Sequence, residues 1–342
     1  MRKEVVLVTG VNGEMGHGLL PALAQEGSCD IIGLDVQTGE SDILRYCKNF
    51  IQGDIIDEML LGRLVAEYEI RSIYHLASIL STKAEHNPLT AHKVNVEGTL
   101  NLLRLAVEQS QWQGRSVRFI YPSSIAVYGL ANINVKNAIS PVKEDQYLQP
   151  TTVYGCNKLY CEHLGRYFAR YYRQLAADSA EHMVDFRCIR FPGLISPTTL
   201  PTGGTSDYAP EIIHSAALGK PYECFVRQDS KIPFMVMSDA IRSLLMIEAA
   251  DKKDLTQFVY NVTSFSLTAE EIHNIILRSY PDSEISYTPS SKRQSIIDSW
   301  PAELDDSAAR SDWNWLPEFS IDNAFEDYLI PVSYTHLTLP TN

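Results

Sequence analysis

Tyr154 and Lys158 stand four residues apart in the sequence Y-G-C-N-K. On a helix that spacing puts both side chains on one face, one turn apart. A phenol with an ordinary pKa of about 10 is a poor base at neutral pH, but a nearby ammonium group favours the phenolate and should lower that pKa. The pair therefore predicts a tyrosine that abstracts a proton, although Tyr and Lys on an amphipathic helix are more often a packed ring and a solvated amine.

Two adjacent serines, Ser123 and Ser124, end a strand-like segment that precedes this pair by about thirty residues. In a doubly wound sheet the carboxyl ends of the strands are where ligands bind. A hydroxyl there can hydrogen-bond a substrate alcohol or carbonyl, and a serine can equally cap the next turn. With two serines side by side, we expect one to serve each purpose.

A glycine-rich segment, T-G-V-N-G-E-M-G at residues 9–16, follows a short apolar run near the start of the chain. Gly10 would permit a tight turn, Gly13 would let the backbone approach a pyrophosphate, and Gly16 would allow close packing of the following helix. The helix N-terminus would supply free N–H groups to the diphosphate. The segment predicts a dinucleotide site, although a glycine triplet alone can be a simple turn.

Asp35 ends the second strand-like run, where a carboxylate can accept hydrogen bonds from the adenosine ribose; a cap or turn role is the alternative. Its charge would repel a 2′-phosphate, and Val36 and Gln37 offer no cation to neutralise one. The sequence therefore favours NAD over NADP. Further along, Asp54 and Ile55 follow a third short strand, where an adenine ring would lie, although a surface turn explains them nearly as well.

The elements that position these residues alternate along the chain. Helical patterns are predicted from about Gly13 to Glu26, over 89–109 and 153–177, and near 268–279. Strand-like runs fall at residues 4–9, 29–35, 72–77, 117–124 and 186–191. This alternation predicts an α/β fold, a Rossmann-type doubly wound parallel sheet with a small C-terminal substrate-binding lobe.

Composition divides the chain into three parts. We expect residues 1–191 to form the NAD-binding domain and residues 192–330 to form mainly the substrate lobe. The stretch 192–208, rich in Pro, Gly and Thr, should be a long active-site loop. Residues 331–342 form a tail that does not continue the preceding helical period from 332 onwards. It resembles the translation of a sequencing adaptor, so we expect it to be non-native and to carry no chemistry.

The composition also limits the classes of partner. Among 342 residues, 45% are hydrophobic and the formal net charge is −13, so a full core is expected and nucleic-acid binding is disfavoured. No apolar run approaches the ~20 residues of a membrane span, and because the first strand-like run begins at about Glu4 we expect no targeting segment. The six cysteines form no zinc-type cluster and should be reduced, buried thiols. We expect a cytoplasmic enzyme without a metal.

The glycine segment, the strand-end serine and Y-x-x-x-K, in this order, resemble the extended short-chain dehydrogenase/reductase family, the NAD-dependent epimerases and dehydratases. Within it, the resemblance is strongest to the branch that oxidises L-threonine, and it covers nearly all of residues 4–330. The segments that carry it are Y-H-L-A-S-I-L-S, F-P-G-L-I-S, G-G-T-S-D-Y-A, Y-E-C-F and, most specifically, D-S-W-P-A-E-L-D-D-S-A-A-R-S-D-W-N-W.

The resemblance implies roles for individual residues. Tyr154 would be the general base, Lys158 its electrostatic partner and a ribose ligand, and Ser124 the hydroxyl that holds the substrate oxygen. The implied substrate-binding residues are Ser81, Ser124, Tyr154, Gly193 and Thr205. The implied cofactor-binding residues are Gly10, Asn12, Gly13, Glu14, Met15, Gly16, Asp35, Val36, Asp54, Ile55, Leu76, Ala77, Ser78, Asn95, Tyr154, Lys158, Pro192, Leu194 and Ile195.

The implied reaction is oxidation of the β-hydroxyl of L-threonine by NAD to 2-amino-3-oxobutyrate, in a homodimer built on the helices around 89–109 and 153–177. A sugar-nucleotide epimerase or dehydratase is the alternative, and a dinucleotide sensor without activity is a third. Ser124 stands where the threonine-oxidising branch commonly has Thr, which favours the epimerase slightly. The loop also lacks an expected Trp and a third Gly. Against the epimerase, no Lys or Arg lies between Arg190 and Lys220 to hold a second diphosphate.

Overall fold

A computed structural model describes residues 3–139, 141–176, 184–201 and 203–338. Its centre is a seven-stranded sheet in the order β10-β6-β5-β4-β1-β2-β3, and every neighbouring pair in it is parallel. This arrangement confirms the predicted α/β, Rossmann-type fold. The strands are β1 (Lys3–Thr9), β2 (Asp30–Asp35), β3 (Asn49–Gln52), β4 (Tyr68–His75), β5 (Arg118–Ser124), β6 (Asp185–Phe191) and β10 (Val259–Asn261).

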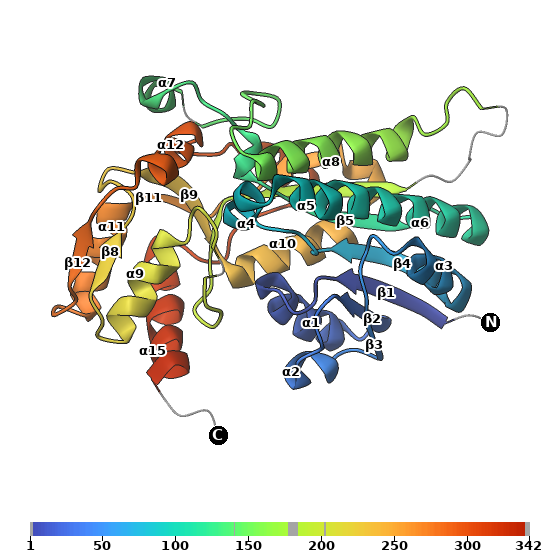
Figure 1. Cartoon of the computed structure of the whole chain (residues 1–342), viewed down its shortest axis with the longest axis horizontal. Helices are drawn as coiled ribbons and strands as arrows, with labels where there is room; N and C mark the ends of the chain where they lie inside the picture. The colour runs from blue at the N-terminus through green and yellow to red at the C-terminus, as the bar shows by residue number, and fades with distance from the viewer. Residues whose placement is uncertain (1–2, 140, 177–183, 202, 339–342) are drawn as a thin grey trace.

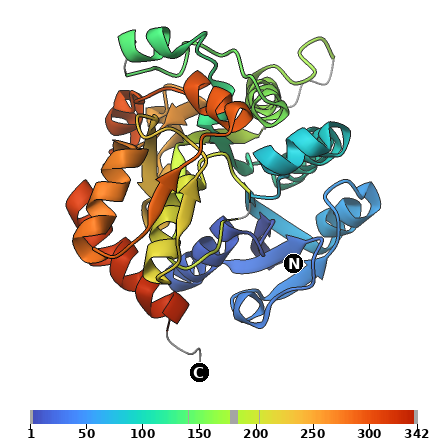
Figure 2. The ribbon, with the colours of Figure 1, turned by 60° about the vertical axis from the view of Figure 1, so that its left-hand side comes forward.

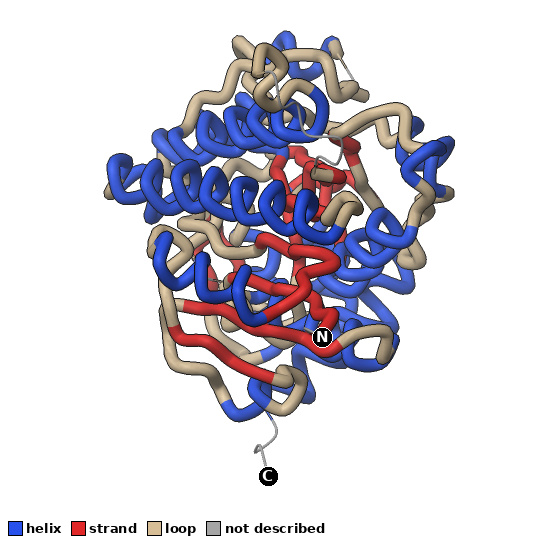
Figure 3. The backbone as a smooth tube through the Cα atoms, turned by 90° about the vertical axis from the view of Figure 1, so that its right-hand side faces the viewer, coloured by secondary structure: helices blue, strands red, loops and turns tan. Residues whose placement is uncertain are grey.

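Helices cover both faces of this sheet because alternate strand residues point to opposite sides (Figures 1 and 3). Val5 and Leu7 of β1 pack with α3 (Glu58–Glu67), α6 (Gly98–Gln113) and α8 (Val153–Arg170). Val6 and Val8 pack on the other side with α1 (Glu14–Glu26), α10 (Met237–Ala249) and α13 (Ser307–Trp313). The continuous apolar runs of the sequence therefore mark strands that are buried on both faces.

Two predicted helices differ in extent from the structure. The expected helix at 89–109 is longer, since α5 (Pro88–His92), the π-helical turn η1 (Lys93–Glu97) and α6 follow one another without a break. The expected helix at 153–177 is shorter, because α8 ends at Arg170. Tyr171 then has φ −126° and ψ 0°, and Arg173 has a positive φ of 53°, so the backbone leaves the helical region before residue 177, which lies outside the described residues.

The C-terminal lobe lies beside the carboxyl ends of the main strands (Figures 1 and 2). It contains a three-stranded sheet, β11-β9-β7, and a two-stranded sheet, β12-β8. The predicted long loop therefore includes a short strand, β7. The strands are β7 (Gly193–Ile195), β8 (Tyr222–Cys224), β9 (Lys231–Val236), β11 (Phe265–Thr268) and β12 (Ile285–Tyr287), and the main helices are α9 (Tyr208–Ala217), α11 (Ala269–Ser279) and α12 (Ser291–Ser299).

Short elements connect these layers, and part of the segment 192–330 returns to the main sheet. Strand β10 and helix α10 both belong to the sheet layer, so that segment contributes to both halves of the molecule. The connecting elements are α2 (Ser41–Leu44), α4 (Ser81–His86), η2 (Ile125–Val127), α7 (Ile133–Ala138), η3 (Lys252–Asp254), α14 (Ile321–Asn323) and η4 (Ala324–Leu329).

The tail is partly helical. Residues Ile330–Thr338 form α15, which packs against α9, and Ser333 is fully buried. Residues 332–338 of the tail thus lie in a helix that packs on α9, whereas residues 339–342 lie outside the described part of the chain; the non-native origin of the tail stays a prediction. The expectation of buried cysteines also needs correction. All six are free thiols, but Cys29 and Cys47 are half-buried and Cys156 is exposed.

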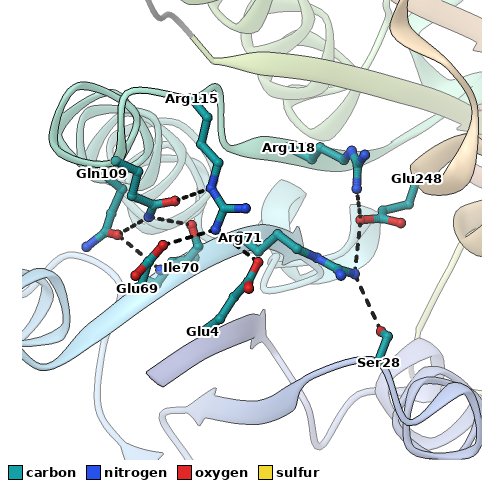
Figure 4. A network of polar contacts seen from close by, with 10 residues as sticks. Glu4, Ser28, Glu69, Ile70, Arg71, Gln109, Arg115, Arg118 and Glu248 are labelled. Atoms are coloured by element: carbon teal, nitrogen blue, oxygen red, sulfur yellow. Dashed lines mark hydrogen bonds and ion pairs between the residues drawn. The ribbon is translucent and has the colours of Figure 1, made fainter. Parts of the chain in front are cut away.

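A network of ion pairs ties the elements together at the amino ends of the strands (Figure 4). Arg118 of β5 lies 3.0 Å from Glu248 of α10, and Arg71 of β4 lies 3.7 Å from the same carboxylate. Arg115 donates to Glu4 and Glu69. This network is at the opposite edge of the sheet from the predicted site. No helix among the described residues has the length and apolar character needed to cross a membrane.

Candidate active site

The glycine segment makes a tight connection from β1 into α1. Gly10 has a φ of 73°, and a Cβ there would lie 2.5 Å from the backbone nitrogen of Ala77. A Cβ on Gly16 would lie 2.1 Å from the carbonyl oxygen of Val11. These two positions therefore require glycine. Gly13 is exposed, and a Cβ there would meet only the Gly10 carbonyl, so its outer side is open to a ligand.

The start of α1 fits a bound diphosphate. Its N-cap residue is Gly13, and no side chain caps the first N–H groups of the helix. Those groups and the helix dipole favour an anion. On the same segment, the Oδ1 atom of Asn12 is buried without a hydrogen-bond partner among the described residues. Glu14 and Met15 begin the helix. The loop therefore has the open side and the donors that a dinucleotide needs.

Asp35 lies at the carboxyl end of β2, beside the glycine segment. Its carboxylate accepts a 3.0 Å hydrogen bond from the Asn12 backbone and another from the Gln37 backbone. It therefore shapes the turn and also keeps lone pairs for the hydroxyls of a ribose, since a carboxylate has about four acceptor sites. Val36 is exposed next to it. Both the ribose role and the turn role suit this geometry.

The remaining expected adenine and ribose contacts differ in exposure. Asp54 is half-buried and accepts from the Ile56 backbone. The Ile55 side chain is buried against α6, where a Cβ on Gly98 would lie 2.4 Å from it, so only its backbone can reach a ligand. Leu76, Ala77 and Ser78 follow β4 at its carboxyl end. Asn95 holds this turn, because its Oδ1 accepts from Ile79 at 2.7 Å and from the Ser78 hydroxyl at 3.2 Å.

The two serines at the end of β5 have different partners. The Ser124 hydroxyl accepts a hydrogen bond from the Ala126 backbone at 3.1 Å and caps η2, which leaves its own proton for a substrate oxygen. The Ser123 hydroxyl is buried and donates to Glu162 at 2.5 Å. Ser124 thus fills the expected capping role, its substrate role stays a prediction, and Ser123 is engaged with Glu162.

Tyr154 and Lys158 lie in the first turns of α8, on the face toward β5. Thr152 caps the helix by accepting from Gly155, and Glu85 of α4 accepts from Val153 at 2.7 Å. The Lys158 ammonium is buried and donates to the Pro122 carbonyl at 2.7 Å. It lies 5.5 Å from the centre of the Tyr154 ring. The hydrogen bond to Pro122 therefore holds Lys158 at the carboxyl end of β5, the strand that Ser124 ends.

The pKa values of Tyr154 and Lys158 differ from what the sequence led us to expect. Burial raises the pKa of the Tyr154 phenol, because the phenolate would lose its hydration. The expected lowering by Lys158 is not seen: the ammonium donates to Pro122 and makes no hydrogen bond to the phenol. Burial also lowers the pKa of Lys158 to about 8, against weaker raising effects of Cys161, Cys188 and Glu162. More positive charge near Tyr154 is thus needed for it to act as a base.

The expected substrate residues Ser81 and Thr205 are in contact with one another. Ser81 begins α4, Thr205 lies just before α9, and their hydroxyls are 3.0 Å apart and buried. Asp207 holds the turn that carries Thr205, since its carboxylate accepts from the backbone N–H groups of Gly203 and Gly204. Gly203 has a φ of 103°, which requires glycine.

The segment after β6 joins the three-stranded sheet of the C-terminal lobe. Gly193, Leu194 and Ile195 form β7 and pair with β9. A Cβ on Gly193 would lie 2.7 Å from the Phe234 ring, so the strand packs closely there. Pro192 and Ile195 are buried, and the Ile195 side chain belongs to the core of the lobe, whereas Leu194 is partly exposed. Ile195 can therefore reach a ligand only through its backbone.

Sequence reasoning missed two residues that support the site. Glu162 and Arg190 form a buried ion pair with an Nη2–Oε2 distance of 2.7 Å, directly behind the strand-end serines. Glu162 follows Lys158 by four residues, and Arg190 interrupts an apolar strand, so both positions carried a recognisable pattern. Among the residues described, no group of three or more His, Cys, Asp or Glu side chains could hold a metal ion.

Comparisons with known proteins agree with this geometry. Residues 6–263 match the NAD dependent epimerase/dehydratase family. The chain is 33% identical over 317 residues to the mitochondrial L-threonine 3-dehydrogenase of Bos taurus, covering 92% of this chain and 79% of that protein. It is 37% identical to the L-threonine dehydrogenase structure from Phytophthora infestans, with a TM-score of 0.82 and coverage of 97% and 99%. A monomeric L-threonine 3-dehydrogenase from a metagenome database is 35% identical, with a TM-score of 0.83 and the same coverage.

Proposed function

The chain belongs to the NAD-dependent epimerase/dehydratase family and is an NAD-dependent oxidoreductase, and from this we propose that it oxidises L-threonine to 2-amino-3-oxobutyrate. The observation that carries the proposal is that segments at the carboxyl edge of the sheet carry three groups of polar side chains. These are the Ser124 hydroxyl, the Tyr154–Lys158 pair on α8 and the buried Ser81–Thr205 hydroxyl pair. Together they offer hydrogen bonds to a small polar substrate and one proton acceptor.

Each residue has a defined task in this proposal. Ser124 donates to the β-oxygen of threonine and orients it toward Tyr154, which accepts the hydroxyl proton. Lys158 would hold the nicotinamide ribose and would keep a positive charge beside the phenol. When bound, the oxidised nicotinamide supplies the hydride acceptor and a further positive charge. That charge would oppose the effect of burial on the pKa of Tyr154. Tyr154 would therefore act as a base only when oxidised NAD is bound.

The protein's own contribution is to bind NAD and the substrate in a fixed position and to exclude water from them. Gly13 and the first N–H groups of α1 would hold the diphosphate, and Asp35 the adenosine ribose. An uncharged 2′-hydroxyl suits the Asp35 carboxylate and a 2′-phosphate does not, so NAD rather than NADP is the proposed cofactor. Ser81 and Thr205 would face the amino acid once their mutual hydrogen bond is exchanged for bonds to the substrate.

A panel of L-threonine, other β-hydroxy amino acids and UDP-hexoses with NAD, followed by NADH absorbance and by sugar analysis, tests the proposal. We expect NADH formation with L-threonine and no interconversion of the UDP-sugars. Epimerisation without threonine turnover would reject it in favour of the sugar-nucleotide alternative. The segment from residue 191 to residue 219 lacks Lys and Arg, which disfavours a second diphosphate there.

A homodimer is a further proposal. Large apolar side chains are exposed on the helices that the family resemblance assigns to the contact: Leu89 of α5 is 86% exposed, Trp112 of α6 62% and Tyr160 of α8 53%. Burying such side chains would favour association. The similar L-threonine 3-dehydrogenase from a metagenome database is, by contrast, a monomer. Analytical ultracentrifugation should show that the parent protein is a dimer and that the Leu89→Glu/Tyr160→Glu variant is a monomer.

A further inference from the structure

Glu162 lies one turn beyond Lys158, so that Tyr154, Lys158 and Glu162 share one face of α8. The carboxylate is 3% exposed and accepts three hydrogen bonds. Arg190 donates from Nε at 2.9 Å and from Nη2 at 2.7 Å, and the Ser123 hydroxyl donates at 2.5 Å. This is a bidentate ion pair, removed from water, behind the catalytic helix face.

The pair connects the elements that carry the active site. Arg190 also donates from Nη1 to the Tyr128 hydroxyl at 2.9 Å and to the Glu144 carbonyl at 2.7 Å. Tyr128 in turn donates to the Asn261 side chain of β10 at 2.7 Å. A continuous chain of hydrogen bonds therefore joins α8, the ends of β5 and β6, and β10. An error in its geometry would displace the base and its lysine together.

At the end of β5, three consecutive residues are held in three ways. Lys158 donates to the Pro122 carbonyl, Ser123 donates to Glu162, and Ser124 caps η2. On the next strand, Arg190 stands two residues before Pro192, where the nicotinamide is expected. Both partners of the ion pair thus adjoin segments that would touch ligands, without touching a ligand themselves.

Several ionisable groups surround Lys158 and the pair. Burial raises the pKa values of the Tyr121, Tyr154, Cys161 and Cys188 side chains and lowers the pKa of His75 to about 3, so these groups are neutral near pH 7. The groups that face Lys158 or the pair are Tyr154, Cys161 and Glu162 of α8, His75 of β4, Tyr121 of β5, Cys188 and Arg190 of β6, and Tyr128 and Glu144, which face Arg190.

We propose that Glu162 and Arg190 are positioning residues whose opposite charges balance at the Tyr154–Lys158 pair, so that Lys158 stays protonated while Tyr154 can ionise. The proposal rests on the function assigned above to that pair. In a buried site, charges act strongly on one another because water does not screen them. Glu162 stabilises the Lys158 ammonium, and Arg190 limits the effect of the Glu162 charge on the Tyr154 phenolate.

The test removes each charge separately. Glu162→Gln leaves Arg190 unbalanced and makes the site more positive, so the pKa values of both Tyr154 and Lys158 should fall. Arg190→Gln leaves Glu162 unbalanced, and both pKa values should rise. We expect displacements of about one unit in opposite directions. They are read from the pH profile of turnover and from 13Cε NMR titration of Lys158 in the free protein, assigned with Lys158→Ala.

Three further variants separate charge from structure. The double variant Glu162→Gln/Arg190→Gln removes both charges, and Arg190→Lys keeps the charge but loses the bidentate geometry. In both, the Lys158 pKa should stay within about half a unit of the parent value, and turnover should fall in Arg190→Lys. Glu248→Gln removes a mostly buried carboxylate that pairs with Arg71 and Arg118 at the opposite edge of the sheet, and it should leave the Lys158 pKa unchanged (Figure 4).

Displacements in the same direction in the two single variants, or none in either, would overturn the proposal. If the single variants do not fold, a displacement of the Lys158 pKa by more than about half a unit in the double variant or in Arg190→Lys overturns it instead. The NMR titration needs no substrate. A protein that forms no NADH with L-threonine but shows opposite displacements of the Lys158 pKa would therefore reject the proposed function and support this inference.

Discussion

The hydroxyl groups of Ser81 and Thr205 lie 3.0 Å apart, buried, although 124 positions separate them in the chain. Ser81 starts α4 on the side of the main sheet, and Thr205 sits on a turn that Asp207 braces through two backbone N–H groups. Each hydroxyl satisfies the other where water is excluded. In the proposed function, the substrate exchanges this hydrogen bond for its own bonds to the two hydroxyls.

Replacement of Ser81 by alanine should raise KM for L-threonine about tenfold with a smaller change in kcat, because one hydrogen bond to the bound substrate is lost and about 1.4 kcal/mol corresponds to a factor of ten. Initial rates of NADH formation over a range of threonine concentrations measure this. Thr198→Ala, at an exposed position in the segment between β7 and Thr205, is the control and should leave KM unchanged. A normal KM in Ser81→Ala would remove Ser81 from the substrate site.

Asp35 should determine the choice of cofactor. Asp35→Asn removes the charge but keeps only one acceptor oxygen, so one of the two hydrogen bonds from the Asn12 and Gln37 backbone N–H groups is lost. The preference for NAD over NADP in kcat/KM should shrink at least tenfold, with a small loss of stability in the turn. Asp35→Asn/Val36→Arg should shrink it further. Both cofactors are compared at the same threonine concentration. A parent enzyme that used NAD and NADP equally well would refute this assignment.

His75 should make the fold sensitive to acid. Its ring lies between the hydroxyls of Thr9 and Thr99, 2.9 Å from each, and burial lowers its pKa to about 3. Between pH 6.5 and 3 the unfolded chain binds a proton that the folded chain does not. The free energy of unfolding should therefore fall as the pH is lowered through this range, by up to about 5 kcal/mol.

Urea unfolding at pH 7.5, 6 and 5 measures this loss, which should already be about 2 kcal/mol at pH 5. His75→Asn removes the titrating ring, so its unfolding free energy should depend less on pH, from a lower starting value. His86→Asn, at an exposed position of α4, should retain the full dependence of the parent. An equal slope in His75→Asn and the parent would show that other groups cause the acid sensitivity.

The sheet could be predicted because β1 and β2 are continuous apolar runs, which are typical of strands that are buried on both faces. Glycine or aspartate marks where each run ends. The glycine segment and the Tyr154–Lys158 pair were equally accessible, since local geometry sets their spacing. The end of α8 could not be predicted, because the helical pattern of the sequence continues past Arg170. The backbone departs from the helix only at Tyr171 and Arg173.

Long-range relationships were the least predictable part of the site. The Glu162–Arg190 pair depends on α8 and β6 meeting behind Ser123, and the contact of Ser81 with Thr205 depends on the lobe closing on α4. The effect of burial on Tyr154 was also misjudged. The sequence places a lysine one turn away, but it does not show that the ammonium would be engaged by the Pro122 carbonyl.

The most direct test of the account is the kcat of Tyr154→Phe with L-threonine and NAD, measured by NADH absorbance beside the thermal midpoint. Phenylalanine keeps the ring and removes only the oxygen that accepts the proton, so kcat should fall by about 10² to 10⁴ while the midpoint and NAD binding are preserved. Tyr160→Phe, an exposed tyrosine on the same helix, should retain the parent kcat. A Tyr154→Phe variant that turned over threonine at a near-normal rate would contradict the assignment of Tyr154 as the base.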